Sequence, residues 1–368
     1  MSIMSKLFDR DDIAIEIGSA NMRVWVKGAG LVLEEPSAVA LAISRDEMEG
    51  SADERQREQD SKTSVKPCKH RVLAIGAAAG DMLGKTPGNI VVIRPMKGGV
   101  VCDYGITKKM FRYCLTHQKV KDACKGGFRR PRALIAVPSD ITEVEKRALE
   151  DAAHSAGAGK VFLIEAPMSA AIGTGLPVSE PKGYMIVDIG ASATKMAVTS
   201  LAGIVHSKVL SVGGDEMNNA IMTYLRDKYG LVVGEREAED IKIKIGTACA
   251  PEKESDYEVK GLDATEGRQL VVTVNSKEIR EEAFAGVLGQ IEDALRGFIA
   301  HVEPELAADI VDNGIVLTGG GALLRGLDKW LAQAAGLTVR VADEPSHATI
   351  LGTSVVLDVL DLLSKNAK

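Results

Sequence analysis

The chain has little of what marks a nucleic-acid-binding, disulfide-rich or membrane-spanning protein. Aromatic residues make up only 4% of its 368 residues, and the formal net charge is −6. Few base-stacking side chains and no excess of positive charge argue against binding to nucleic acid. The five cysteines form no CxxC pair, which predicts reduced cytosolic thiols rather than disulfides or a metal site. No stretch reaches the roughly 18 apolar residues of a membrane span, and no signal-peptide pattern is present.

What the chain does contain is ordinary for a large globular protein. Hydrophobic residues are 45% of the total and charged residues 26%, so a sizeable core is expected. The length predicts two or three domains, or one large bilobed unit. One segment differs from the rest, because residues 46–69 are polar and charge-dense. We expect this segment to form a mobile surface loop.

Two antiparallel meanders of the same kind, about 170 residues apart, indicate an internal repeat. The first covers residues 12–33 and bends at Gly18–Asn21, and the second covers residues 183–210 and bends at Gly190–Ala193. Alternating or continuous apolar residues predict strands on both sides of each bend. Helices are expected at 77–83, 107–116, 142–156, 167–173, 216–229, 235–246, 277–302 and 348–364, and from 319–321 to about 335.

Each meander carries an acid and several small residues at its first turn, as Glu16-Ile-Gly-Ser-Ala-Asn and as Asp188-Ile-Gly-Ala-Ser-Ala. Small residues let backbone N–H groups approach phosphate oxygens, and the acids can hold a magnesium ion through its waters. A third turn, Gly319–Gly321, follows a predicted strand and opens a predicted helix, whose N-terminus would face phosphate. The three turns together predict a nucleotide-binding site.

At these turns the chain resembles the superfamily of actin, Hsp70 and sugar kinases, and its motifs look like those of MreB, the bacterial actin homologue. The resemblance covers about residues 12 to 360 and implies an α/β, actin-like bilobed fold. This fold has two repeated mixed-sheet domains, an ATP cleft between them, and four subdomains. The matching motifs are Lys85-Thr-Pro-Gly-Asn-Ile90, Ile93-Arg-Pro-Met-Lys97, Ile141-Thr-Glu-Val-Glu145, Pro167-Met-Ser-Ala-Ala-Ile-Gly173, Val212-Gly-Gly-Asp-Glu-Met217 and Gly314-Ile-Val-Leu-Thr-Gly-Gly-Gly321.

The resemblance also implies a domain division and a function. The expected parts are an N-terminal segment (1–11), domain I (12–165), domain II with the nucleotide floor (166–345), and a C-terminal helix returning to domain I (346–368). The implied cofactors are ATP and Mg²⁺. The implied assembly is a homopolymer of paired protofilaments on the inner face of the cell membrane. There it would work with cell-wall elongation membrane proteins to organise wall synthesis and rod shape.

Individual residues take roles from the same resemblance. Asp188 would orient magnesium and its water, and Glu16 would be the acid of the first hairpin. The first phosphate loop would be Gly18, Ser19, Ala20 and Asn21, and the second Gly190, Ala191, Ser192 and Ala193. Gly213, Gly214 and Asp215 would approach the ribose and phosphates, Glu239 and Lys242 would flank the base and ribose, and Gly319, Gly320, Gly321, Ala322 and Leu323 would form the adenosine floor.

The chain departs from the family's motifs at positions that carry chemistry. Glu16 stands where the family has Asp, and Met22 where it has Thr. In the second loop Ala193 lacks a hydroxyl and Lys195 reverses a charge. The family's Glu-Glu-Pro junction reads Glu165-Ala166-Pro167 here, and the missing second glutamate is the one that would position the attacking water. Because such a group contributes roughly 10²–10⁴-fold in rate, we expect ATP to bind and to be hydrolysed slowly. Glu165 is the weaker candidate to take over this role.

Two apolar features suggest contact with a membrane. Ile3, Met4, Leu7 and Phe8 fall on one face of a short amphipathic turn. The family's membrane-binding loop falls at residues 125–130, where Phe128 is flanked by basic residues that would suit an anionic bilayer.

Two other functions remain open at this point. One is a non-hydrolysing paralogue that copolymerises with or caps another MreB. The other is an Hsp70-like or sugar-kinase-like soluble ATPase, although the chain lacks room for a peptide-binding domain and shows no sugar-kinase base signature.

Overall fold

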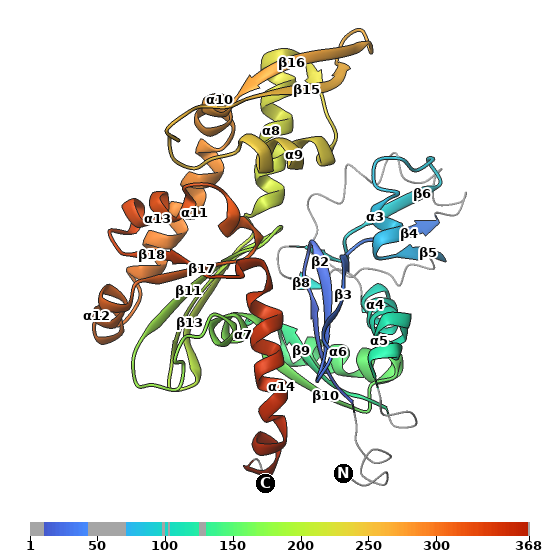
Figure 1. The fold of residues 1–368 in the computed structure, drawn as a ribbon, viewed down its shortest axis with the longest axis vertical. Helices are drawn as coiled ribbons and strands as arrows, with labels where there is room; N and C mark the ends of the chain where they lie inside the picture. Colours follow the sequence, from blue (N-terminus) through green and yellow to red (C-terminus); the bar gives the residue numbers. More distant parts are fainter. Residues whose placement is uncertain (1–10, 43–70, 98–99, 102–103, 125–129, 367–368) are drawn as a thin grey trace. The chain divides into compact units, whose positions relative to one another are not determined.

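The structure is a computed structural model that describes residues 11–42, 71–97, 100–101, 104–124 and 130–366 (Figure 1). It divides into two compact units. Unit 1 comprises Met1–Val137, Ile141–Ile164 and Leu357–Lys368, and unit 2 comprises Pro138–Asp140 and Glu165–Val356.

Unit 1 is built around a five-stranded sheet with the strand order β10-β9-β1-β2-β3. The first three strands in sequence form the predicted antiparallel meander, and β1 also pairs in parallel with β9. The guanidinium of Arg132 on β9 donates two hydrogen bonds of 2.6 Å to the Asp12 carboxylate on β1, which stabilises the β1–β9 pair. The strands are β1 (Asp12–Ile17), β2 (Asn21–Val26), β3 (Gly30–Pro36), β9 (Arg132–Val137) and β10 (Lys160–Glu165).

Helices and two smaller sheets complete unit 1. The helix that the sequence predicted from residue 142 begins with a capping box, because Thr142 and Glu145 bond each other's backbone N–H groups. The helices are α3 (Ala77–Gly80), α4 (Tyr104–Thr116), α5 (Gln118–Ala123) and α6 (Glu143–Ala156). A three-stranded sheet contains β4 (Val39–Ala42), β5 (Arg71–Ile75) and β6 (Ile90–Ile93), and β7 (Met96–Lys97) pairs with β8 (Val100–Val101).

Unit 2 repeats the topology of the large sheet, with the order β13-β12-β11-β17-β18. Again three consecutive strands form a meander, and the first of them pairs in parallel with a strand much later in sequence. The predicted internal repeat is therefore confirmed at the level of strand pairing. The strands are β11 (Tyr184–Ile189), β12 (Thr194–Ser200), β13 (Gly203–Leu210), β17 (Ile315–Thr318) and β18 (Val339–Val341).

The rest of unit 2 is helical, with one small sheet. Helices α8 and α9 pack side by side, and α9 also contacts β15 (Figure 1). The helices are α7 (Ala166–Gly173), α8 (Gly214–Tyr229), α9 (Glu235–Ile245), α10 (Ser276–Glu278), α11 (Ala285–Ile299), α12 (Pro304–Asn313), α13 (Leu327–Ala335) and α14 (Ala348–Asn366), with short 3-10 turns at Gly320–Leu323 and Pro345–His347. The small sheet contains β14 (Leu231–Val232), β15 (Asp256–Asp263) and β16 (Gln269–Asn275).

Three expected helices differ from the observed ones. The helix expected from Gly319 onward is wrong at its start, because a 3-10 turn comes first and α13 begins only at Leu327, after Gly326 at φ 74°. The helix expected over 277–302 is interrupted by a π-helical segment at Ile279–Ala283. The C-terminal helix was assigned whole to domain I, but its first part, up to Val356, belongs to unit 2.

Close packing of α7 against α14 explains why the start of α14 belongs to unit 2. A Cβ at Gly173 would lie 1.9 Å from the carbonyl oxygen of Ala348, and one at Gly352 would lie 1.7 Å from that of Ser169. The Ser169 hydroxyl also donates to the carbonyl of Thr349 at 2.8 Å. The two helices therefore meet backbone to backbone, which only glycine permits.

Candidate functional site

The first predicted phosphate turn is a tight bend between β1 and β2. The N–H of Gly18 donates to the carbonyl of Asn21 at 2.9 Å and closes the turn. The carbonyl of Ala20 accepts from the N–H of Ser37 at 2.8 Å, which anchors the bend to the segment after β3. Gly18, Ser19 and Asn21 are half-buried and Ala20 is exposed. The bend is therefore held by backbone hydrogen bonds and remains partly accessible.

The second turn is closed in the same way and is joined to the start of α8. Gly190 N–H donates to the carbonyl of Ala193 at 2.8 Å. In addition, Gly214 N–H donates to the carbonyl of Gly190 at 3.0 Å, and Asp215 N–H donates to that of Ala191 at 2.7 Å. A Cβ at Gly213 would lie 2.6 Å from the Gly190 oxygen, so this approach requires glycine. The second phosphate turn and Gly213–Asp215, which the sequence places in one site, are in contact.

The third turn packs directly on the second hairpin. Asp188 and Thr318 are register partners in the parallel pair β11–β17, so Gly319 leaves the sheet beside Asp188. Gly319 has φ 84°, and a Cβ there would lie 2.3 Å from the carbonyl oxygen of Ile189 and 2.4 Å from Oδ1 of Asp188. Both the backbone angle and the lack of space therefore demand glycine at this position.

Lys242 and Glu239 lie on α9 and face the start of α8. The ammonium of Lys242 donates to the carbonyl of Gly214 at 3.0 Å and to Oε2 of Glu239 at 2.6 Å. The amide of Asn218, on α8, donates to the same Glu239 oxygen at 2.6 Å. Within unit 2, the predicted ligand residues of α8, α9 and the second and third turns thus form one connected group.

Sequence reasoning missed Asn218, which is 2% exposed. Among the residues that the structure describes, its side-chain oxygen has no hydrogen-bond partner, and neither has the buried hydroxyl of Thr318. A buried polar atom without a partner is costly unless a ligand or water satisfies it. Both atoms are therefore candidate ligand contacts. Asn218 lies on the buried face of α8, one helical turn after Gly214. Its place one turn after a predicted ligand residue was the signal available in the sequence.

Both acids assigned to the site are paired with a cation on the neighbouring strand. Glu16 is the cross-strand partner of Arg23, and Arg23 Nη1 lies 3.3 Å from Glu16 Oε2. Asp188 is the cross-strand partner of Lys195, and Lys195 Nζ lies 3.6 Å from Asp188 Oδ2. Sequence reasoning noted the reversed charge at Lys195 but not this pairing, and it did not single out Arg23.

These pairs do not fit a magnesium ion held through Asp188. Two unit charges about 4 Å apart interact by about 4 kcal/mol at an effective dielectric constant near 20, so Lys195 already compensates the negative charge of Asp188 that would otherwise attract a divalent ion. Within the described ranges, no cluster of three or more His, Cys, Asp or Glu side chains is arranged to hold a metal ion. The magnesium site at Asp188 stays a prediction that the surrounding charges disfavour.

The residues that depart from the family's motif differ in their surroundings. Ala166 is 6% exposed and is the first residue of α7, while Glu165 precedes it with an extended backbone (φ −69°, ψ 129°). Glu165 therefore precedes the helix, whereas Ala166 is part of it. Ala193 is buried in the second turn.

Met22 has a different role from the one that the sequence suggested. Its side chain is fully buried in the core of unit 1, where its sulfur lies 3.8 Å from Sγ of Cys114. Met22 is opposite Ile17 and therefore points away from the face that carries Glu16 and Arg23. We therefore treat this departure as a packing difference and not as a change of catalytic group.

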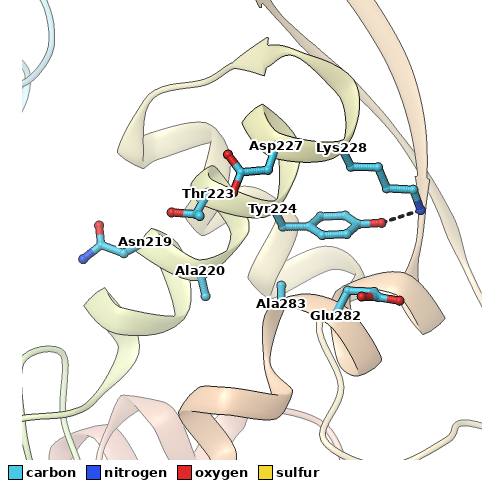
Figure 2. Close-up of a pocket in the computed structure, with 8 residues that line it drawn as sticks. All are labelled: Asn219, Ala220, Thr223, Tyr224, Asp227, Lys228, Glu282 and Ala283. Carbon is cyan, nitrogen blue, oxygen red and sulfur yellow. Dashed lines mark hydrogen bonds between the residues drawn. The ribbon is translucent and has the colours of Figure 1, made fainter.

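Unit 2 also contains a hollow of about 660 Å³ (Figure 2). Its lining residues come from α8 and the π-helical segment: Asn219, Ala220, Thr223, Tyr224, Asp227, Lys228, Glu282 and Ala283. Beside it, Glu278 accepts from the hydroxyls of Tyr224 and Tyr229 at 2.8 and 2.7 Å. Burial would raise the pKa of Glu278, but hydrogen bonds from Tyr229, Tyr224 and Lys228 hold it below its usual range. The polar groups of Tyr224, Tyr229, Lys228 and Glu278 bond one another, which is typical of a structural cluster.

The proposed membrane contacts lie outside the described residues. These contacts are Ile3, Met4, Leu7, Phe8 and Phe128. The polar segment 46–69, which was expected to form a surface loop, also lies outside the described residues. Among the helices that are described, none has the length and apolar content to cross a bilayer.

Comparison with known proteins agrees with this geometry. A family model described as MreB/Mbl protein matches residues 10–365. Cell shape-determining protein MreB of Escherichia coli K12 is 43% identical over 357 residues, covering 96% of this chain and 94% of the relative. Cell shape-determining protein Mbl of Bacillus cereus is 41% identical over 356 residues, covering 97% and 98%. The crystal structure of MreB5 of Spiroplasma citri bound to AMPPNP is similar with a TM-score of 0.84 at 29% identity, covering 98% of this chain and 99% of that one. The expected actin-like α/β fold is confirmed, and the chain belongs to the MreB/Mbl family of cell shape-determining, actin-like filament proteins.

Proposed function

We propose that this chain binds ATP at the connected turns of unit 2 and polymerises with itself into a nucleotide-dependent cytoskeletal filament. The observation that carries the proposal is that the second hairpin contacts two other predicted ligand segments. Its turn bonds the start of α8, and its strand end at Asp188 and Ile189 packs against Gly319. The AMPPNP-bound MreB5 of Spiroplasma citri, similar over almost its whole length, supports a nucleotide as the ligand.

The residues of unit 2 have the chemistry to hold such a ligand. Backbone N–H groups of Ala191 and Ser192 in the second turn suit phosphate oxygens. The N–H groups of Gly214 and Asp215 already donate to this turn and hold it against the start of α8. Lys242 brings a positive charge to the start of α8, where Glu239 also lies. The unpartnered oxygen of Asn218 is suited to accept a hydrogen bond from the ribose or the base.

The filament would organise cell-wall synthesis and rod shape at the inner face of the membrane, together with wall-elongation membrane proteins. The cell-shape role printed for the MreB and Mbl relatives supports this part of the proposal. A second candidate is a non-hydrolysing paralogue that copolymerises with or caps another MreB, and Ala166 and Ala193 favour it. The family match gives no support to an Hsp70-like or sugar-kinase-like activity.

Assembly is the direct test of the proposed function. The purified chain with AMPPNP should form paired filaments in electron micrographs and should pellet on ultracentrifugation, because polymerisation needs bound nucleotide and not its cleavage. A nucleotide-free sample at the same protein concentration is the control. Finding only monomers with ATP, ADP and AMPPNP, with and without lipid, would refute the filament.

Membrane attachment has its own test. Deleting residues 1–8 together with Phe128→Ser should abolish pelleting with anionic liposomes, because it removes all the apolar side chains proposed to insert. Basic residues that remain near the surface supply only about 1 kcal/mol each. Nucleotide binding, measured in parallel, should be unchanged. If the variant pellets with liposomes as well as the parent chain does, these residues are not the anchors.

A further inference from the structure

The same acid–cation arrangement occurs in both large sheets. In each hairpin, the acid two residues before the turn glycine has a basic residue directly opposite it: Arg23 for Glu16 and Lys195 for Asp188. Directly opposed residues of an antiparallel pair project to the same face, which brings the charged groups together. The separations are 3.3 Å in unit 1 and 3.6 Å in unit 2.

Both pairs are largely shielded from water. The side chains of Arg23 and Glu16 are 8% and 15% exposed, and those of Lys195 and Asp188 are 22% and 11% exposed. Shielded charges interact more strongly than surface pairs and are screened less by salt. Each acid therefore already has a fixed counter-ion that belongs to the protein.

The two cations are not equivalent. Arg23 also bonds Glu34 at 2.8 Å, so two carboxylates share its charge. Lys195 belongs to the strand that leaves the second phosphate turn, two residues after Ala193. An ammonium has three donors and binds phosphate as a point charge, so Lys195 can contact Asp188 and a phosphate oxygen at once. It lies beside the carboxylate where a magnesium ion would have been expected, and its charge opposes the entry of that ion.

We propose that Lys195 replaces magnesium in this chain: the lysine holds Asp188 and neutralises the bound polyphosphate, so the nucleotide binds as the metal-free triphosphate. This inference rests on the proposed nucleotide binding and specifies how the charge of the ligand is balanced. In unit 1, Arg23 pairs with Glu16 but shares its charge with Glu34, so the replacement is assigned to Lys195 alone.

The test is calorimetric titration of the full chain with ATP, once with Mg²⁺ and once with EDTA. For the unmodified chain the two dissociation constants should agree within about threefold. Lys195→Met keeps a long apolar side chain and removes the charge. In EDTA this variant should bind at least about tenfold more weakly than the parent, and Mg²⁺ should restore most of the loss by binding the freed Asp188.

Two variants control the experiment. Lys208→Met removes an exposed charge from β13 of the same sheet and should bind like the parent in both buffers. Lys195→Arg keeps the charge and should bind in EDTA, which separates loss of the cation from loss of packing. If the unmodified chain binds ATP at least about tenfold more tightly with Mg²⁺ than with EDTA, the inference is wrong while the proposed function stands. If the unmodified chain binds ATP in neither buffer, the proposed function fails, and this inference fails with it.

Discussion

Gly319→Ala should weaken ATP binding at least about hundredfold, or about 2.7 kcal/mol. The new methyl group would lie 2.3 Å from the Ile189 carbonyl oxygen and 2.4 Å from Asp188 Oδ1, so the second hairpin and the third turn must separate. The Ile189 carbonyl belongs to the backbone of β11 and cannot move aside, even if the Asp188 carboxylate rotates. Calorimetric titration with ATP measures the loss, and thermal unfolding shows whether the variant remains folded.

The matched control is Gly336→Ala. Gly336 has a similar positive φ of 67°, but a Cβ there has no atom within 4 Å among the described residues. Gly336→Ala should therefore lose only about 1–2 kcal/mol of folding stability to backbone strain, and its ATP affinity should be unchanged. Equal ATP affinities of Gly319→Ala and the parent chain would mean that the Gly319–Gly321 turn is not part of the nucleotide site.

Phosphate release by the unmodified chain under polymerising conditions should be at least about 100-fold slower than that of a family member with an intact Glu-Glu-Pro junction. Ala166 cannot orient a water molecule. Such a carboxylate acts mainly in the transition state, so ATP affinity should be affected little. The comparison requires both proteins to be measured side by side. Equal rates would show that the departures at Glu16, Ala166 and Ala193 do not limit hydrolysis.

Two variants identify which residue limits the rate. Ala166→Glu should raise phosphate release by no more than about 10²–10⁴-fold, and by less if the altered Glu16 and Ala193 also matter, because catalytic groups are not additive. Glu165→Gln should leave the residual rate unchanged. A large fall in Glu165→Gln would instead show that Glu165, which is half-buried at the end of β10, positions the water.

Local sequence signals determined the parts of this protein that depend on neighbours in the chain. The two meanders, their tight glycine turns and the helix start at Thr142 follow from local sequence signals, and all are present in the structure. Strands β15 and β16 were not predicted, although polar and apolar residues alternate in Asp256-Tyr-Glu-Val-Lys260 at the start of β15. The helix expected over 277–302 contains a π-helical segment, because its register depends on packing as well as on apolar spacing.

The family resemblance named nearly all of the site residues, but it could not give their partners. Asn218 reaches Glu239 because α8 and α9 pack side by side, and no spacing in the sequence encodes a contact between two helices. Met22 looked like an altered catalytic position, yet the alternation of side chains along β2 points Met22 into the core, beside Cys114.

The charged residues of the site show most clearly what the sequence determined and what only the structure decided. The sequence by itself determined that an acid stands before each turn and that Lys195 departs from the family's motif. The predicted bend at Gly190–Ala193 already implies that Asp188 and Lys195 are opposed. Only the tertiary structure decided that the two charges lie 3.6 Å apart, largely shielded from water and beside Gly319. Pairing between strands is a property of the folded sheet, and here it determines whether the acid is available to a metal ion or already neutralised by the protein.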